Sequence, residues 1–212
     1  MNRKLLLLVL AVLAIGVGVL IYAATRNDDD GGIEGTSNTD AAFSAVSTEG
    51  LDFVATISSS GSGQGTKSTV SYDGEGRWQY QTSADGQSVQ TIVTPDAYYT
   101  NSGQGWYKLP LSGESDSSGF NAETYEYSAA EIDALKQSSI YEGQKDCPAG
   151  TCHVWRTSTA GDSSTVYIDT KTNRISQVVS VIGSTTSTIA YEYKNVTVNV
   201  PADAQPLPGL NQ

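Results

Sequence analysis

The feature that most constrains this chain is an uncharged apolar run near its N-terminus, from Leu5 to Ala24. As an α-helix, its 20 residues span about 30 Å, the thickness of the hydrocarbon core of a bilayer. A cleavable signal peptide has a shorter apolar region of about 7–15 residues, which ends at small residues. Here Ile21 and Tyr22 stand where small residues are needed. The run therefore favours an uncleaved transmembrane signal anchor over residues 5–24, with a cleaved signal peptide as the alternative.

The charges on either side of this run predict its orientation. Arg3 and Lys4 precede it, and three aspartates at 28–30 follow it. Positively charged flanks remain in the cytoplasm. We therefore expect a cytoplasmic stub at residues 1–4 and a single pass through the cell membrane. The rest of the chain is then extracytoplasmic, or secreted if the run is cleaved.

The part of the chain beyond the apolar run is strongly acidic. It holds all 23 Asp and Glu residues but only 10 of the 12 Lys and Arg residues. Such a surface repels phosphate backbones, and the sequence has no block of basic residues that would contact them. We therefore expect no nucleic-acid partner.

The two cysteines, Cys147 and Cys152, are predicted to form a disulfide. Thiols outside the cytoplasm tend to be oxidised, and the intervening Pro-Ala-Gly-Thr segment at 148–151 is typical of a turn that would let them face one another across a hairpin. A dithiol redox centre usually has the spacing C-x-x-C, whereas this one is C-x4-C. A zinc site with His153 lacks a recognisable fourth ligand. On a strand, His153 and Trp155 lie on the face opposite Cys152 and Val154.

Composition and periodicity divide the remainder into a linker, a domain and a tail. Residues 25–40 are polar, acidic and rich in glycine, which predicts a flexible linker. Residues 41–200 have the length of one domain, and 201–212 read as an irregular tail. Within the domain, short runs of alternating polarity separated by turn residues predict antiparallel strands. These runs are 51–59, 66–74, 77–83, 87–94, 96–101, 105–110, 139–147, 152–158, 164–170, 174–182 and 185–200.

Two short helices are expected among the strands. Asp40 is a candidate N-cap for a helix over 41–48. Ser128 and Glu131 form a capping-box pattern before a second helix over 129–137. The predicted class is therefore α+β and mainly β.

The order of these elements resembles the LolA/LolB-like lipoprotein-carrier superfamily, which includes mycobacterial lipid-carrier lipoproteins and the sensor domain of an envelope-stress regulator. The segments that carry the resemblance are "SYDGEGRWQYQTS", "QSVQTIVTPDAYYTNSGQGWYKL", "CHVWRTS", "STVYIDTKTNRISQVV" and "YEYKNVTVNVPADA". The resemblance covers about 41–204. It implies a protein of the bacterial envelope with a strongly curved antiparallel sheet, an incomplete barrel, packed over about two helices.

The resemblance also implies a function. Members of that superfamily hold acyl chains of lipids or lipoproteins on the concave side of the sheet, and they have neither catalytic residues nor a cofactor. We expect a membrane-tethered carrier or sensor with a hydrophobic ligand, and a sensor role would require a protein partner. Candidate residues for the lining or mouth of the cavity are Val70, Tyr72, Trp78, Tyr80, Trp106 and Tyr107. Such aromatic residues are equally suited to a packed sheet core.

Two other functions compete with the carrier. An extracytoplasmic interaction or adhesion module would have both sheet faces filled by protein side chains and no internal ligand. An enzyme is disfavoured, because the chain has one histidine, no G-x-S-x-G motif, no paired metal motif and no phosphate-binding loop. Its carboxylates are numerous enough to be ordinary solvated surface.

Overall fold

The computed structural model describes residues 43–61, 66–84, 87–111, 125–159 and 161–206. These residues belong to two compact units. Unit 1 contains 43–48 and the described residues from 125 to 184, and unit 2 contains the described residues from 49 to 111 and from 185 to 206. The predicted stub, anchor and linker at 1–40 lie outside the described residues. Within the described part of the chain, no helix is long and apolar enough to cross a membrane.

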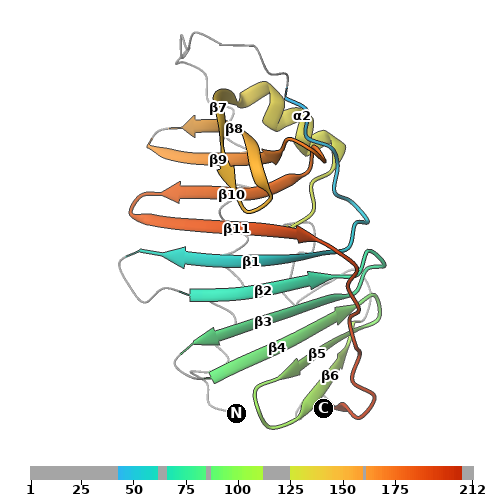
Figure 1. The fold of residues 1–212 in the computed structure, drawn as a ribbon. Helices are drawn as coiled ribbons and strands as arrows, with labels where there is room; N and C mark the ends of the chain where they lie inside the picture. Colours follow the sequence, from blue (N-terminus) through green and yellow to red (C-terminus); the bar gives the residue numbers. More distant parts are fainter. Residues whose placement is uncertain (1–42, 62–65, 85–86, 112–124, 160, 207–212) are drawn as a thin grey trace. The chain divides into compact units, whose positions relative to one another are not determined.

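The described residues of unit 2 form eight strands (Figure 1). They are β1 (Phe53–Ser60), β2 (Thr66–Tyr72), β3 (Trp78–Ala84), β4 (Gln87–Thr94), β5 (Ala97–Asn101), β6 (Trp106–Pro110), β11 (Thr185–Tyr193) and β12 (Gln205–Pro206). Their order across the sheet is β12-β6-β5-β4-β3-β2-β1-β11. Every pairing among β1–β6 and β11 is antiparallel, and the short β12 runs parallel to β6.

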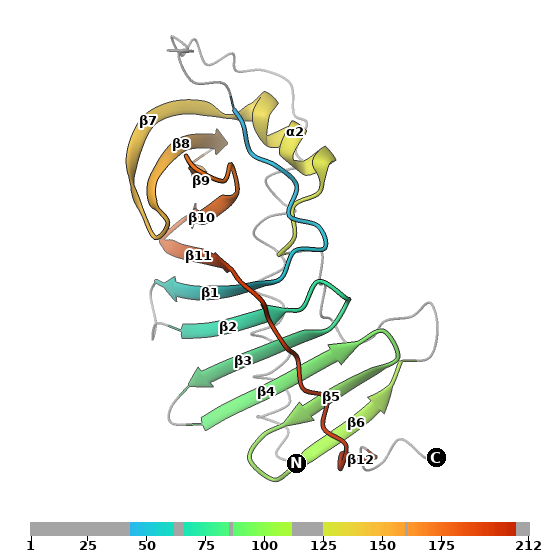
Figure 2. The same ribbon diagram turned by 45° about the vertical axis from the view of Figure 1, so that its right-hand side comes forward.

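The described residues of unit 1 form one helix and four strands. They are α2 (Ala129–Ser138), β7 (Ile140–Cys147), β8 (Gly150–Thr159), β9 (Asp162–Asp169) and β10 (Ile175–Ile182). The strands are antiparallel in the order β10-β9-β8-β7. Figure 2 shows that β7 and β8 are strongly bent. A bulge lies in β7 between Tyr141 and Gly143, where glycine supplies a φ of 94°, and such a bulge bends and twists its strand.

The helix α2 confirms the capping-box prediction. The Ser128 side chain accepts a hydrogen bond from the backbone N–H of Glu131, and the Glu131 carboxylate accepts one from the backbone N–H of Ser128. Both donors would otherwise have no partner at the helix start. Ile132 is the buried residue of the helix, and Leu135 is half-buried.

The predicted helix over 41–48 is wrong for the residues described, 43–48, which are not helical. The backbone N–H of Val46 donates to the carbonyl of Asn173, and that of Thr48 donates to the carbonyl of Tyr127. These distant partners satisfy the backbone in place of a helix. The described part of the chain therefore has one α-helix where about two were expected.

The ends of the predicted strands are confirmed to within two residues, and both ends of β4 match. The run 185–200 is an exception, because β11 ends at Tyr193 and the chain continues as an irregular segment. The tail is not wholly irregular, because Gln205 and Pro206 pair with Tyr107 and Lys108.

Candidate functional site

The register of unit 2 collects apolar side chains on one face of its sheet. Side chains alternate between faces along each strand, so directly paired residues share a face. Phe53 belongs to a row of direct cross-strand partners that extends over seven strands. None of the residues in this row is charged, and none is a serine, threonine, asparagine or glutamine. In order from β11 to β6, this first row is Tyr193, Phe53, Tyr72, Trp78, Val93, Tyr98 and Leu109.

Two further rows lie on the same face and include serine and threonine residues. The second row is Tyr191, Ala55, Val70, Tyr80, Thr91, Thr100 and Tyr107. The third is Ile189, Ile57, Ser68, Thr82 and Val89. We call these three rows the apolar face of unit 2. None of their residues is charged, and the first row alone contains neither serine nor threonine.

The opposite face, which we call the polar face, has a different composition. On β1, β2 and β3 it carries Val54, Thr56, Ser58, Lys67, Thr69, Ser71, Gln79, Gln81 and Ser83, none of which is buried. Its buried part is a cluster of Ile92, Ala97 and Tyr99 with Val198 from the segment after β11. Val196 anchors that segment by donating a backbone hydrogen bond to Asp52 Oδ2 at 3.0 Å.

Aromatic rings at one end of the apolar face contact one another. Phe53 is fully buried, and its ring centroid lies 5.7 Å from that of Tyr72 and 5.8 Å from that of Trp78. On the other side it lies 5.6 Å from Tyr191 and 6.3 Å from Tyr193. Edge-to-face and offset contacts at these distances stabilise aromatic pairs beyond the burial of their area. Phe53 is thus the centre of an aromatic cluster.

Hydroxyl groups on the apolar face bond to one another. Tyr80 donates to Ser68 Oγ at 3.0 Å, and Ser68 donates to Thr82 Oγ1 at 3.0 Å. Burial raises the pKa of Tyr80, although the hydrogen bonds with Ser68 and Thr82 oppose the shift. Burial likewise raises the pKa of Tyr98, whose hydroxyl lies 3.4 Å from Thr91 Oγ1. Both phenols are therefore neutral at physiological pH.

Five of the six residues expected to line a cavity share the apolar face. Val70 pairs with Tyr80 and Tyr72 pairs with Trp78, so all four side chains lie on one face of β2 and β3. Tyr107 joins them in the second row through Thr100.

Trp106 lies on the other face. It neighbours Tyr107 in the same strand, so the two side chains point to opposite sides of the sheet. Trp106 is half-buried and packs against the Ile92 cluster on the polar face.

The sequence analysis did not select Phe53, Tyr98, Leu109, Tyr191 or Tyr193, which belong to the same rows. Period-two patterns in the sequence indicate two of the strands involved. These patterns are Phe53-Ala55-Ile57 in β1 and Ile189-Tyr191-Tyr193 in β11. Their apposition across the sheet depends on register, and the sequence pattern alone does not fix the pairing.

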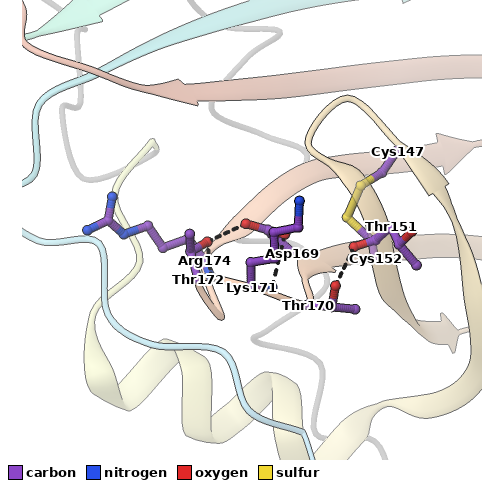
Figure 3. The surroundings of a disulfide bond; sticks show 8 residues. All are labelled: Cys147, Thr151, Cys152, Asp169, Thr170, Lys171, Thr172 and Arg174. Atoms are coloured by element: carbon purple, nitrogen blue, oxygen red, sulfur yellow. Dashed lines mark hydrogen bonds between the residues drawn. A yellow bond between two sulfur atoms is a disulfide. The ribbon is translucent and has the colours of Figure 1, made fainter.

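The predicted disulfide is present in unit 1 (Figure 3). The Cα atoms of Cys147 and Cys152 are 5.9 Å apart. The cysteines were expected to face one another across the hairpin, but they are not direct cross-strand partners. The hairpin turns at Pro148 and Ala149, and Cys147 pairs with Gly150. Gly150 adopts a φ of 115°, which a residue with a side chain rarely adopts.

The β9–β10 turn lies next to this hairpin and is tied to it. Thr170 donates from both its backbone N–H and its hydroxyl to the carbonyl of Thr151 (Figure 3). Within the turn, the Asp169 carboxylate accepts from the backbone of Lys171 at 3.1 Å and from the Thr172 hydroxyl at 2.6 Å. These contacts have a structural role, because they hold one hairpin against the next.

His153 has an aromatic environment and lies on the face opposite Cys152, as expected. Its Nδ1 is 3.0 Å from the Tyr141 hydroxyl, and the same Tyr141 ring lies 4.9 Å from Trp155. In the part of the chain that the structure describes, no group of three or more His, Cys, Asp or Glu residues is arranged to hold a metal ion.

No protein-family model matches the sequence, and no curated protein does. Solved structures are similar to the chain at low identity. LprF from Mycobacterium bovis is 13% identical, with 74% of this chain and 91% of that chain covered and a TM-score of 0.49. The lipoprotein LppX from Mycobacterium tuberculosis is 13% identical, with coverages of 73% and 92% and a TM-score of 0.45.

A LolA superfamily protein from Nitrosomonas europaea is also similar, at 6% identity, coverages of 71% and 87% and a TM-score of 0.30. With TM-scores below 0.5, none of these likenesses assigns a function to this chain. A LolA superfamily protein and a mycobacterial lipoprotein, both kinds of protein named in the sequence resemblance, are thus among the solved structures similar to the chain.

Proposed function

We propose that this protein binds the acyl chain of a lipid or lipoprotein against the apolar face of unit 2. It acts as a non-catalytic carrier or sensor on the extracytoplasmic side of a membrane, tethered through residues 5–24. The observation that carries the proposal is the set of three cross-strand rows, which contain no charged residue.

The energetics of such binding are favourable. Each buried methylene group contributes about 0.8 kcal/mol, so ten of them contribute about 8 kcal/mol. Association costs at least about 4 kcal/mol in lost freedom of motion. A long acyl chain therefore binds usefully without any charged contact, which suits a face whose polar atoms are hydroxyls.

The difference between the first and third rows supports a direction for the bound chain. Phe53, Tyr72 and Trp78 lie in the row that has no serine or threonine, and Ser68 and Thr82 lie in the third row. The methyl end of the chain is expected near the first row, and the more polar end near the third.

The disulfide supports the extracytoplasmic location. Disulfides persist in oxidising compartments and are rare in the cytoplasm. A tether at residues 5–24 would keep the protein beside the membrane that supplies its ligand.

An interaction module with no internal ligand is the second candidate. The observation that favours it is the mutual packing of Phe53, Tyr72 and Trp78, whose rings already cover one another. The two candidates differ in whether the purified protein contains lipid.

The test is mass spectrometry of organic extracts from the purified full chain and from two variants of β4. Val93→Glu places a charge on the apolar face, and Gln90→Glu places the same charge on the polar face of the same strand. Both positions are half-buried. We expect close to one lipid per chain from the wild type and from Gln90→Glu, and at least about tenfold less from Val93→Glu. Equal recovery from both variants, or none from the wild type, would support the module instead.

A further inference from the structure

The charged residues of unit 2 gather at one end of its strands. At this end β1, β3 and β5 begin, and β2, β4, β6 and β11 finish. For β1 to β4 and β11 it lies on the right of Figure 1. We call it the acidic end, because its acidic residues outnumber its basic residues, Arg77, Lys108 and Lys194, by six to three. The acidic residues are Glu49, Asp52, Asp73, Glu75, Asp96 and Glu192.

The other end of the same strands, which we call the neutral end, carries almost no charge. From the second row of the apolar face to this end, Lys67 is the one charged residue on the described strands of unit 2. The connection between β3 and β4 contains Asp85, which lies outside the described residues, so the two charges balance. The exposed uncharged residues at this end include Ser60, Gly61, Thr66, 102–105 and Thr185.

The two ends are far enough apart to act independently in an electric field. The strand β1 has eight residues and is therefore about 27 Å long. At physiological ionic strength, charges in solution are screened over about 8 Å. A charged surface in contact with the neutral end is thus about three screening lengths away from the acidic end. The neutral end can approach an anionic surface without the repulsion that the acidic end would meet.

We propose that unit 2 docks on an anionic lipid bilayer through its neutral end. The inference rests on the proposed function in one respect, because it takes a membrane to be close to the protein. Each charge that comes close to an anionic membrane changes binding about fivefold, so the acidic end is repelled. At the neutral end, the Lys67 ammonium and the hydroxyls of Ser60 and Thr66 can donate hydrogen bonds to lipid phosphates.

The residues next to the neutral end suit this contact. Trp106 follows the exposed segment 102–105 and is half-buried. Tryptophan favours the interface between membrane and water, because its ring is apolar and its N–H is a donor. Of the three rows of the apolar face, the third lies nearest to this end. Docking therefore turns toward the bilayer the row at which the polar end of a bound lipid is expected.

The predicted tether permits this orientation. The linker at 25–40 has 16 residues and can span more than about 50 Å when it is extended. This reach is about twice the length of β1, so the anchor does not force the acidic end onto the membrane.

The test measures which end lies nearer to the bilayer. The full chain is reconstituted in phosphatidylglycerol vesicles that contain phosphatidylcholine with a nitroxide on its headgroup, which quenches fluorescence at short range. A fluorophore is attached to one added cysteine, Ser60→Cys at the neutral end or Asn195→Cys at the acidic end. Both positions are exposed and uncharged, and the two native cysteines are held in the disulfide. We expect quenching at position 60 to be at least about threefold stronger, because the ends are about 27 Å apart.

A pair of charge variants tests the electrostatic cause. In the protein labelled at Ser60→Cys, Gln104→Glu adds a negative charge to the neutral end, and Asn195→Glu adds the same charge to the acidic end. Both positions are exposed. We expect Gln104→Glu to lower the ratio of docked to undocked protein about fivefold, and Asn195→Glu to change it less than about twofold. At about 1 M salt, where screening acts over about 3 Å, the two variants should behave alike.

The outcomes separate the docking from the proposed function. Equal quenching at the two labels, stronger quenching at position 195, or equal effects of the two charge variants at low salt would overturn the docking and leave lipid binding intact. If the labels differ as expected but organic extracts of the protein contain no lipid, the proposed function fails and the docking stands. If the chain does not stay with the vesicles, the tether and the docking both fail.

Discussion

Tyr72 and Trp78 stack face to face across β2 and β3, with ring centroids 4.0 Å apart and planes inclined by 18°. They are direct cross-strand partners, and Phe53, which pairs with Tyr72 from β1, contacts both rings. The first row of the apolar face is thus a continuous aromatic surface over three strands. Its residues stabilise the sheet as well as forming the proposed binding surface.

Removing the Trp78 ring should therefore destabilise the protein strongly. Trp78 is 3% exposed, and we expect Trp78→Ala to lower the free energy of unfolding by about 3–5 kcal/mol. Urea unfolding followed by circular dichroism measures the change. The matched substitution is Trp106→Ala. Because Trp106 is only half-buried and lies on the opposite face, this change should lower the free energy of unfolding clearly less. Equal losses in the two variants would contradict the assignment of Trp78 to the core of the aromatic cluster.

The Asp169 carboxylate should make stability depend on pH. Burial would raise its pKa, but hydrogen bonds from Thr172 and from the backbone of Lys171 and Thr172 outweigh burial, and the net shift is downward. A carboxylate with a lowered folded-state pKa stabilises the fold above its ordinary pKa. That contribution is lost as the pH falls from about 4 through the lower folded-state value.

We expect Asp169→Asn to lower the free energy of unfolding by about 2 kcal/mol at pH 7. The difference from the wild type should shrink at pH 2.5, because the stabilisation by the Asp169 carboxylate declines once the pH falls below the ordinary pKa of an aspartate. Chemical unfolding of the wild type and the variant at pH 7 and pH 2.5 measures this difference in the free energy of unfolding. Asp146→Asn, at an exposed position of the same unit, serves as the control and should change stability little. If the loss in free energy of unfolding caused by Asp169→Asn instead grew as the pH was lowered, this account would be contradicted.

The disulfide should contribute modestly to stability. It closes a loop of only six residues, and replacing both Cys147 and Cys152 by Ser is expected to cost about 2 kcal/mol. The β7–β8 pairing and the Thr170 contacts remain to hold the hairpin. Urea midpoints of the double variant and of the wild type measure the cost, and bound metal is checked by elemental analysis. Global unfolding of the variant, or metal that only the wild type binds, would refute a purely structural role.

The capping box should set the start of α2. In Ser128→Ala the backbone N–H of Glu131 loses its acceptor, and we expect a loss of about 1 kcal/mol. Amide hydrogen exchange should quicken in the first turn of the helix. Ser138→Ala, at the other end, removes a hydroxyl that bonds back to the carbonyl of Ala134 and should have a smaller effect. Unchanged exchange in the first turn of Ser128→Ala would show that the cap does not determine this helix start.

The strands could be predicted from the sequence because their signals are local. In β4, the alternation in "QSVQTIVT" is bounded by Gly86 and Pro95, and both of its ends were predicted correctly. The helix α2 was predicted for the same reason, since Ser128 and Glu131 are three residues apart. Such features depend on neighbours in the sequence.

Features that depend on distant partners were not predicted. The segment 43–48 has helix-compatible residues, but Val46 and Thr48 donate to Asn173 and Tyr127, which are far away in the sequence. The same applies to the parallel pairing of Gln205 with Tyr107. Trp106 was grouped with Tyr107 because both are aromatic, although strand alternation places neighbours on opposite faces.

The opposite positions of Trp78 and Trp106 allow a direct test of lipid binding to the apolar face. Brominated acyl chains quench tryptophan fluorescence only at close range, so 9,10-dibromostearic acid is titrated into two variants that each retain one of these tryptophans. In Trp106→Phe with Trp155→Phe, we predict saturable quenching of Trp78. In Trp78→Phe with Trp155→Phe, the fluorescence of Trp106 should change little. Equal quenching of the two tryptophans, or no quenching of Trp78, would contradict the account.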